Sequence, residues 1–363
     1  AGMTIEAMAG DPQARAIGGV LFADNCAACH GSNARGNPLI GAPNLGDSDW
    51  LYGGDGNDAL GGGGGNDVMY GGFGNDIFYI DSVSDQAIEL AGQGLYDNIY
   101  TVLSSFSLVG LNNIEFLTGI SAGAQTLTGN DLNNIMAGGN ASDVLAGGLG
   151  NDTLYGGLGN DLLGGGGGID YYFGGAGNDS FYVDNASETI IELAGGGTDT
   201  ILTSVAAYSM AAFAEVENLI GLLTTGQLLV GNIRGNGITG GTGNDVLMGG
   251  LGNDTLNGGL GNDSFVFNTT LGATNIDTIT GFSVPNDTVQ LDDLIFTALS
   301  LGALGAGAFA IGAAASSAAH RVIYNSANGN LLYDADGTGA GAAVVFANVG
   351  GGLALTSADF LVV

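Results

Sequence analysis

A nine-residue phrase, Gly-Gly-x-Gly-x-Asp-x-U-x with U a large apolar residue, recurs along much of this 363-residue chain. It is first complete at Gly53–Gly61 and repeats without a gap as far as Tyr79. Paired glycines allow the positive φ angles that a tight turn needs. The last three residues form a short strand whose middle side chain faces inward, because neighbours on a strand alternate faces. A single turn cannot bury that one apolar residue, so successive turns must stack.

The phrases fall into three blocks, 53–79, 129–182 and 231–266, separated by two inserts, 80–128 and 183–230. The inserts are copies of one another, since Glu89 and Glu115 in the first reappear as Glu192 and Glu217 in the second. The pattern is typical of a parallel β-helix built from modular repeats. It predicts an inward-facing stack made of Leu60, Met69, Phe78, Leu145, Leu154, Leu163, Tyr172, Phe181, Leu247, Leu256 and Phe265.

The aspartate at position six of each phrase places a hard oxygen ligand on the inside of the turn. Calcium takes six to eight oxygen ligands in tolerant geometry, so carboxylates and glycine-turn carbonyls suit it. The alternative is that these aspartates only cap turns, as aspartate commonly does in loops. A column of unneutralised carboxylates one turn apart would repel strongly, which favours bound metal.

Taken together, these phrases resemble the RTX (repeats-in-toxin) β-roll proteins from Gly53 to the C-terminus. The resemblance implies that calcium ions lie between successive turns, held by the position-six aspartates and by backbone carbonyls. Two phrases depart from the pattern, with Ala141 at position four and Ile169 at position five, and their sites are expected to be the weakest. The carboxylates that match the motif are Asp58, Asp67, Asp76, Asp143, Asp152, Asp161, Asp170, Asp179, Asp245, Asp254 and Asp263.

The opening phrases of the second and third blocks carry Asn134 and Asn236 at position six. A neutral, weaker ligand is expected at a capping turn, whose outer side has no neighbour with which to share an ion. Beyond the last block, residues 267–363 predict a C-terminal β domain with strands near Thr288–Leu291, Arg321–Tyr324 and Ala343–Val349. Its end, Asp359–Val363, resembles the export signal of RTX proteins secreted by type I systems.

Residues 1–52 have a different composition and hold both cysteines of the chain. Thr4–Ala28 predicts one or two short α-helices. Cys26-Ala27-Ala28-Cys29-His30 is a C-x-x-C-H motif, the pattern of c-type haem attachment, in which two thiols bind the haem and His30 supplies an axial ligand. A Cys26–Cys29 disulfide and a zinc site are the alternatives.

The surrounding run, about residues 16–53 with Gly18–Asn25 and Trp50–Gly53, resembles a cytochrome c domain from the multihaem subunit of bacterial haem–copper oxidases. The resemblance ends at Gly53 without a matching distal methionine. Candidate sixth ligands are Met3, Met8, Met69 and His320. Haem is attached outside the cytoplasm whereas type I export bypasses the periplasm, so either the motif holds no haem or export follows another route.

Composition narrows the classes of function. Asp and Glu total 36 against four Arg and no Lys, for a net charge of −32, which repels nucleic acid and anionic membranes and attracts cations. The uncharged run Ile295–Ala319 is mostly Ala, Gly and Ser, so no membrane span is expected. Without lysine, and with only His30 and His320, the chain lacks the residues of most catalytic motifs, and no catalytic residue is predicted.

These features together predict a bacterial calcium-binding β-roll protein, extracellular or on the cell surface, that self-assembles as a filament, sheath or S-layer-like lattice. It is expected to bind several calcium ions and one haem c, with other copies of itself and, through calcium, cell-surface glycans as partners. The second hypothesis is an electron-transfer protein whose polymer forms an array of haems. A third is a secreted adhesin or accessory protein.

Overall fold

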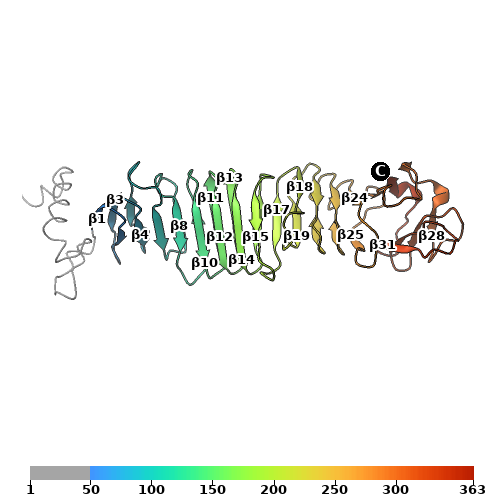
Figure 1. The fold of residues 1–363 in the computed structure, drawn as a ribbon, viewed down its shortest axis with the longest axis horizontal. Coiled ribbons are helices and arrows are strands. Elements are labelled where there is room, and N and C mark those ends of the chain that lie inside the picture. The colour runs from blue at the N-terminus through green and yellow to red at the C-terminus, as the bar shows by residue number, and fades with distance from the viewer. Residues whose placement is uncertain (1–49) are drawn as a thin grey trace, which may run out of the picture. The chain divides into compact units, whose positions relative to one another are not determined.

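The structure, a computed structural model, describes residues 50–363, which divide into two compact units between Gly175 and Ala176. Each unit contains short parallel strands stacked side by side (Figure 1). Within residues 50–363 the only helical elements are two 3-10 turns, η1 (Ala306–Ala308) and η2 (Ser357–Asp359), and there is no α-helix. The prediction of an all-β, parallel β-solenoid protein is confirmed, while the predicted N-terminal helices lie outside these residues.

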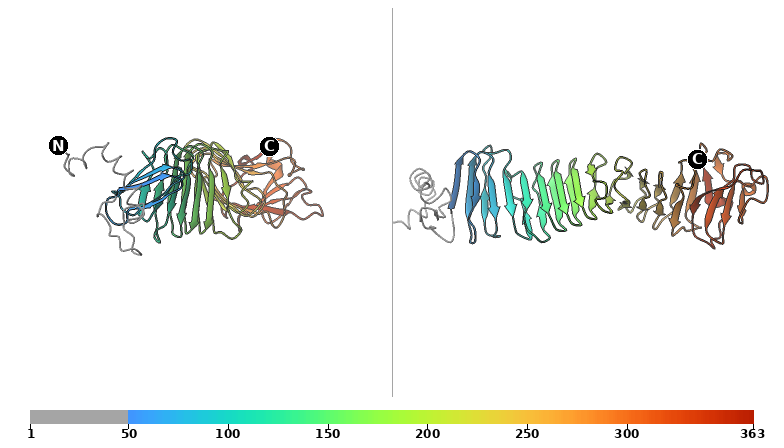
Figure 2. Two further views of the ribbon diagram at one scale, coloured as in Figure 1. Left: turned by 60° about the vertical axis from the view of Figure 1, so that its left-hand side comes forward. Right: turned by 60° about the horizontal axis from the view of Figure 1, so that its bottom comes forward.

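In the first unit, consecutive strands alternate between two stacks (Figure 2). The odd-numbered stack consists of β1 (Trp50–Asp55), β3 (Val68–Phe73) and β5 (Gln86–Ile88), followed in a separate sheet by β7 (Ser105–Ser107), β9 (Thr126–Thr128), β11 (Val144–Leu149) and β13 (Leu162–Gly167). The even-numbered stack consists of β2 (Ala59–Gly61), β4 (Ile77–Ile80), β6 (Asn98–Thr101), β8 (Phe116–Gly119), β10 (Ile135–Gly139) and β12 (Thr153–Leu158). The unit closes with β14 (Tyr171–Ala176).

The second unit repeats this arrangement. One stack runs β15 (Ser180–Val183), β17 (Thr200–Thr203), β19 (Asn218–Gly221), β21 (Gly237–Thr239), β23 (Thr255–Asn257) and β25 (Asp277–Thr280). The other runs β18 (Ala207–Ser209), β20 (Leu228–Val230), β22 (Val246–Met248), β24 (Ser264–Phe267) and β26 (Thr288–Leu291). Strand β16 (Thr189–Ile191) belongs to a different sheet from β18.

Each pair of phrases makes one coil. Residues that pair across neighbouring strands lie two phrases apart in the repeat blocks, as in Ile135 with Thr153 and Val144 with Leu162. The apolar residue of each phrase therefore lies above its counterpart one coil earlier. All eleven side chains of the predicted inward stack are at most 1% exposed, so that prediction is confirmed. This column of apolar side chains is the core that each phrase needs its neighbours to complete.

The inserts supply coils to the same stacks. Strand β6 pairs in parallel with β4 on one side and with β8 on the other, and β8 pairs with β10. The coil lengthens where the insert begins, because Ile77 pairs with Asn98, which lies further along the chain than a pair of phrases would reach. On the opposite stack the sheet is interrupted between β5 and β7. The division of the chain into seven domains stays a prediction.

The C-terminal residues complete the second unit. Strand β31 (Val344–Asn348) pairs in parallel with β25, and an antiparallel meander continues through β30 (Asn330–Tyr333) and β29 (Val322–Asn325), beside which β28 (Phe309–Ile311) lies parallel. The last strand, β32 (Phe360–Val362), lies between β26 and β27 (Gly302–Ala303). The three strands predicted here from sequence are confirmed to within one or two residues.

The end of the chain is part of the fold. Phe360 and Val362 are at most 2% exposed, and the Thr356 and Asp359 side chains cap η2 reciprocally. The five residues that resemble an export signal therefore extend a sheet of the solenoid. Within residues 50–363 no helix has the length and apolar character needed to cross a membrane.

Candidate metal sites

At the turns, the carboxylates of the position-six aspartates accept backbone N–H groups of the neighbouring coil, in place of the backbone carbonyl groups that accept them within the sheets. The backbone N–H of Asp143 donates to Oδ1 of Asp161 one coil later (2.7 Å), and the N–H of Asp152 donates to Oδ1 of Asp170 in the same way (2.7 Å). The N–H groups of Asp58 and Asp245 make the same bond across one coil. One oxygen of each such carboxylate therefore satisfies a buried backbone donor that the turn leaves without a strand partner.

The second carboxylate oxygen faces the glycine turn. The Oδ2 atoms of Asp58, Asp76, Asp143, Asp152 and Asp254 are buried and accept no hydrogen bond. A Cβ built on Gly138 would lie 2.6 Å from Asp143 Oδ2 and 2.9 Å from the Gly156 carbonyl oxygen of the next coil. Glycine at position one of the phrase thus leaves room where carboxylate and carbonyl oxygens converge. Carboxylate and carbonyl oxygens are the donors that calcium prefers, so these residues fit a calcium ion.

The glycines at positions two and four have a different role. In the phrase that begins at Gly147, Gly148 and Gly150 have φ angles of 113° and 107°. These angles lie in the region that residues with a Cβ rarely adopt. They turn the chain tightly enough for its carbonyl groups to line the inside of the turn.

Because these carboxylates are buried, ionising them without a nearby positive charge destabilises the folded chain. Burial raises the pKa of Asp152 to about 7, and the charge of Asp170 adds to the rise. Burial also raises the pKa of Asp58, Asp76 and Asp143. Raised pKa values of this kind mean that the folded chain disfavours the ionised carboxylates in the absence of a cation. A divalent cation between coils would supply the missing compensation.

The eleven predicted ligands occupy equivalent places in the turns. All except the partly exposed Asp58 are at most 3% exposed. Asp245 differs, because its Oδ2 accepts the backbone N–H of Gly241 (2.8 Å). In the phrase with Ala141, Asp143 Oδ2 is buried and accepts no hydrogen bond, as is the case for Asp152 Oδ2 in a regular phrase. The assignment of calcium to the individual aspartates stays a prediction.

Position five of the phrase carries a second ladder of side-chain acceptors. The Asn151 Oδ1 accepts the backbone N–H of Ile169 (2.8 Å), and the Asn133 Oδ1 accepts that of Asn151 (2.7 Å). Ile169 has no acceptor to offer a later coil, although its own N–H is satisfied. The frequent asparagine at position five is thus explained by main-chain hydrogen bonding.

The prediction of capping turns at Asn134 and Asn236 is wrong. Strand β10 follows Asn134 directly and pairs with β8, and β21 follows Asn236 and pairs with β19, so both turns have a neighbouring coil. The Asn134 side chain accepts the N–H of Asn130 and donates to the carbonyl oxygens of Ile114 and Glu115. The amide satisfies this turn through hydrogen bonds of its own, where an aspartate would leave an oxygen for a cation.

Two clusters of carboxylates lie where the inserts join the repeats. Asp76, Glu89 and Asp97 bring one ligand oxygen each within 4.8 Å of one another, and Asp179, Glu192 and Asp199 do the same in the second unit. The motif matched only the first aspartate of each set. The duplication of the inserts was the available signal, because Glu89 and Asp97 correspond to Glu192 and Asp199.

The remaining site residues predicted from the sequence are those of the haem motif and its candidate sixth ligands. Cys26, Cys29 and His30 lie outside the residues that the structure describes. His320 lies in a turn, where its Nδ1 is 3.2 Å from the backbone nitrogen of the exposed Ser316 and 3.5 Å from its Oγ.

Comparison with known proteins identifies four copies of the RTX calcium-binding nonapeptide repeat, at residues 45–78, 128–163, 164–191 and 230–265. The chain therefore carries RTX calcium-binding repeats, and it arranges them as a parallel β-solenoid. The extracellular lipase LipA from Serratia marcescens is a distant structural neighbour, 14% identical with a TM-score of 0.19, over 74% of this chain and 45% of the lipase.

The short N-terminal segment is similar to a different class of protein. It is 65% identical over 49 residues to the Cbb3-type cytochrome c oxidase subunit CcoP of Rubrivivax gelatinosus, covering 14% of this chain and 16% of the subunit. It is 65% identical over 40 residues to the subunit FixP of Bradyrhizobium sp. (strain ORS 278), covering 11% and 14%. The chain thus spans only a small part of the length of these relatives.

Proposed function

We propose that this chain is an extracellular calcium-loaded β-roll protein with a structural role at the bacterial cell surface. The observation that carries the proposal is the set of buried Oδ2 atoms of Asp58, Asp76, Asp143, Asp152 and Asp254, which accept no hydrogen bond and each face a turn glycine. The RTX repeats and the net charge of −32 support the same conclusion, because both favour bound divalent cations. Calcium would neutralise these carboxylates and link neighbouring coils, making the solenoid of each unit rigid where calcium is abundant.

Self-assembly is the second part of the proposal. Strand β28 lies at the edge of its sheet, and its last residue, Ile311, is 60% exposed. An unpaired edge strand offers backbone donors and acceptors to another chain. The surface also carries exposed carboxylates, among them Asp55 and Asp131, that calcium could bridge between copies or to cell-surface glycans. An adhesin role is the weaker alternative.

Calcium is expected to convert the purified chain from monomers into ordered polymers. Sedimentation velocity and negative-stain electron microscopy of one sample, with calcium and with a chelator, would test this. Filaments or sheets should form with calcium and disappear on chelation, while magnesium at the same concentration should not replace it. A folded, calcium-loaded chain that stays monomeric at high concentration would contradict self-assembly and would leave the calcium-binding proposal standing.

A role in electron transfer is the second candidate function, favoured by the similarity of the N-terminal segment to CcoP and FixP. In this proposal Cys26 and Cys29 bind one haem c covalently and His30 is an axial ligand. A polymer would then carry one haem per subunit. Conduction along it would require neighbouring haems to lie close together.

Expression with a c-type haem-attachment system is expected to yield protein with a Soret band and a haem-stained band after denaturation. The variant Cys26→Ser/Cys29→Ser should lose both signals and keep its calcium-dependent β signal. Colourless wild-type protein with two titratable thiols would exclude the haem and leave the structural role.

A further inference from the structure

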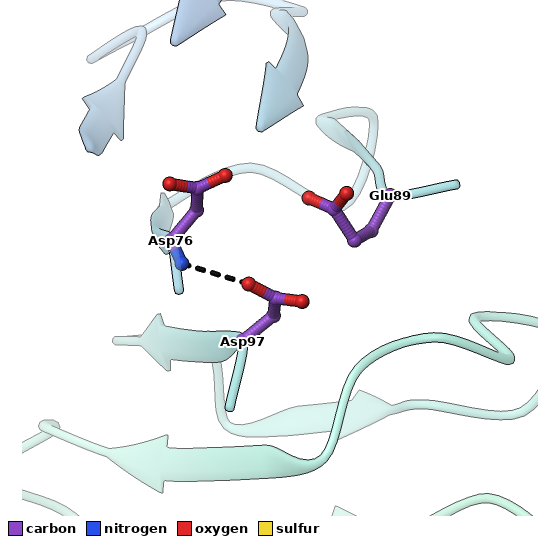
Figure 3. A group of neighbouring side chains, drawn as sticks. All are labelled: Asp76, Glu89 and Asp97. Atoms are coloured by element: carbon purple, nitrogen blue, oxygen red, sulfur yellow. Dashed lines mark hydrogen bonds between the residues drawn. The ribbon is translucent and has the colours of Figure 1, made fainter. Parts of the chain in front are cut away.

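Three acidic side chains converge beside the first insert. Asp76 precedes β4, Glu89 follows β5 directly, and Asp97 precedes β6 (Figure 3). One ligand oxygen of each lies within 4.8 Å of the others. Calcium–oxygen bonds of about 2.4 Å place ligands on opposite sides of an ion about 4.8 Å apart, so all three can bind one ion.

Each carboxylate in this cluster is held by one oxygen and leaves the other free. Asp97 Oδ1 accepts the N–H of Asp76 (2.7 Å), Asp76 Oδ1 accepts that of Asp58 (2.8 Å), and Glu89 Oε1 accepts that of Leu90 (3.2 Å). Asp76 Oδ2, Glu89 Oε2 and Asp97 Oδ2 are buried without a hydrogen-bond partner. Asp76 and Asp97 are 0% exposed and Glu89 is 9% exposed. Three like charges this deeply buried require a counter-charge.

Glycines make room around the free oxygens. A Cβ built on Gly71 would meet both Glu89 Oε2 and Asp76 Oδ2, and one on Gly94 would meet Asp97 Oδ2 and the carbonyl oxygen of Gly74. The Gly74 carbonyl is therefore a further oxygen beside the cluster. A cavity of about 260 Å³ borders Glu89 and is lined by Gly110 and Asn112, which are exposed, so a hydrated ion has a route to the site.

We propose that Asp76, Glu89 and Asp97 form a calcium site that binds more tightly than the sites of the regular turns. The inference rests on the proposed calcium-loaded fold and adds a distinct class of site to it. Glu89 and Asp97 lie outside the residues matched by the RTX repeat. The turn of Asp143 brings one free carboxylate oxygen to a glycine carbonyl, whereas this junction brings three. Calcium affinity rises with the number of charged ligands and with the rigidity of the site.

The second insert repeats the arrangement with Asp179, Glu192 and Asp199, whose ligand oxygens also lie within 4.8 Å of one another. The chain thus has two junction sites, one in each unit. Each lies where the coil is longer than two phrases, as the pairing of β4 with β6 and of β15 with β17 shows. The longer coil supplies the glutamate that the nine-residue phrase lacks.

Titration of the full chain with calcium against a competing chromophoric chelator tests the proposal. The wild type should show two tight sites and a separate class of weaker ones. The variant Glu89→Gln/Glu192→Gln should lose the tight class, with affinity falling on the order of 10- to 100-fold at both sites. The matched control is Glu115→Gln/Glu217→Gln, which removes the same charge one coil later. There the Glu115 and Glu217 Oε2 atoms already accept the N–H of Asp97 and Asp199, so both tight sites should remain.

Loss of the tight class in both double variants would show an effect of net charge and overturn the proposal. Unchanged binding in Glu89→Gln/Glu192→Gln would also overturn it, and the regular sites would still stand. A wild type that binds no calcium would instead refute the proposed function itself. If the Gln variants do not fold, anomalous diffraction from calcium-loaded wild-type crystals decides. A peak bonded to the three free oxygens supports the site, and its absence while peaks appear along the regular turns contradicts it.

Discussion

Replacing Asp152 by asparagine is expected to destabilise the calcium-loaded protein and to stabilise the calcium-free fold. The free Oδ2 of Asp152 is fully buried, so with calcium the substitution removes a charged ligand at a cost of about 3 kcal/mol. Without calcium it removes a buried uncompensated charge, which gains about 1–3 kcal/mol. Asn134 and Asn236 show that this fold accepts an amide at the same position of the phrase.

Two measurements test the destabilisation expected with calcium and the stabilisation expected without it. The urea midpoint in saturating calcium should fall for Asp152→Asn, and the concentration of trimethylamine N-oxide that restores the β signal in chelator should also fall. The work belongs at pH 8, because the pKa of Asp152 is raised to about 7 and its charge penalty disappears as the pH falls through that value. The exposed Asp131→Asn is the control and should change neither midpoint. The same direction of change with and without calcium would contradict a metal-binding role for Asp152.

The nine-residue period was sufficient to predict the inward stack of the regular phrases. It places Leu154 and Tyr172, and the other nine side chains of the inward stack, on the buried side of their strands, and all are buried. The prediction succeeds because the strands are short and the stack repeats. The inward position in one phrase determines it in every other phrase.

The junction clusters could not be derived from the phrase. Glu89 and Asp97 lie in a segment without the repeat, and they meet Asp76 only because the insert forms a coil of the same solenoid. The pairing of the C-terminal strand could not be predicted from the sequence for the same reason. Phe360–Val362 reads as an apolar tail in sequence, yet it pairs with β26, which precedes the whole C-terminal meander in the chain. Contacts of this range depend on the number of residues in each coil, which composition and spacing do not reveal.

The error at Asn134 has an equally local cause. A departure from the motif was interpreted as the end of a stack, although the coil before it is built from the insert. Its hydrogen bonds to the carbonyl oxygens of Ile114 and Glu115 connect an insert coil to a repeat coil. The turn at Asn134 is closed by hydrogen bonds of the amide, whereas the turns at Asp143 and Asp152 leave a carboxylate oxygen for a cation.

Removal of calcium is expected to have the largest effect of all, the loss of most of the folded structure at neutral pH. The ligand oxygens converge only in the folded state, so the free energy of calcium binding is part of the free energy of folding. Without calcium, the buried carboxylates repel one another and remain desolvated, at a cost of several kcal/mol for each ion. With only one buried apolar side chain per phrase, the hydrophobic core cannot offset a penalty of that size along the whole stack.

Far-ultraviolet circular dichroism of the full chain during a calcium titration from a chelated start tests this most directly. The β signal should be absent in chelator, should appear cooperatively as calcium is added, and should not appear with magnesium or with sodium chloride of equal ionic strength. A full β signal in chelator, unchanged by calcium, would show that the carboxylate column needs no metal and would contradict the account.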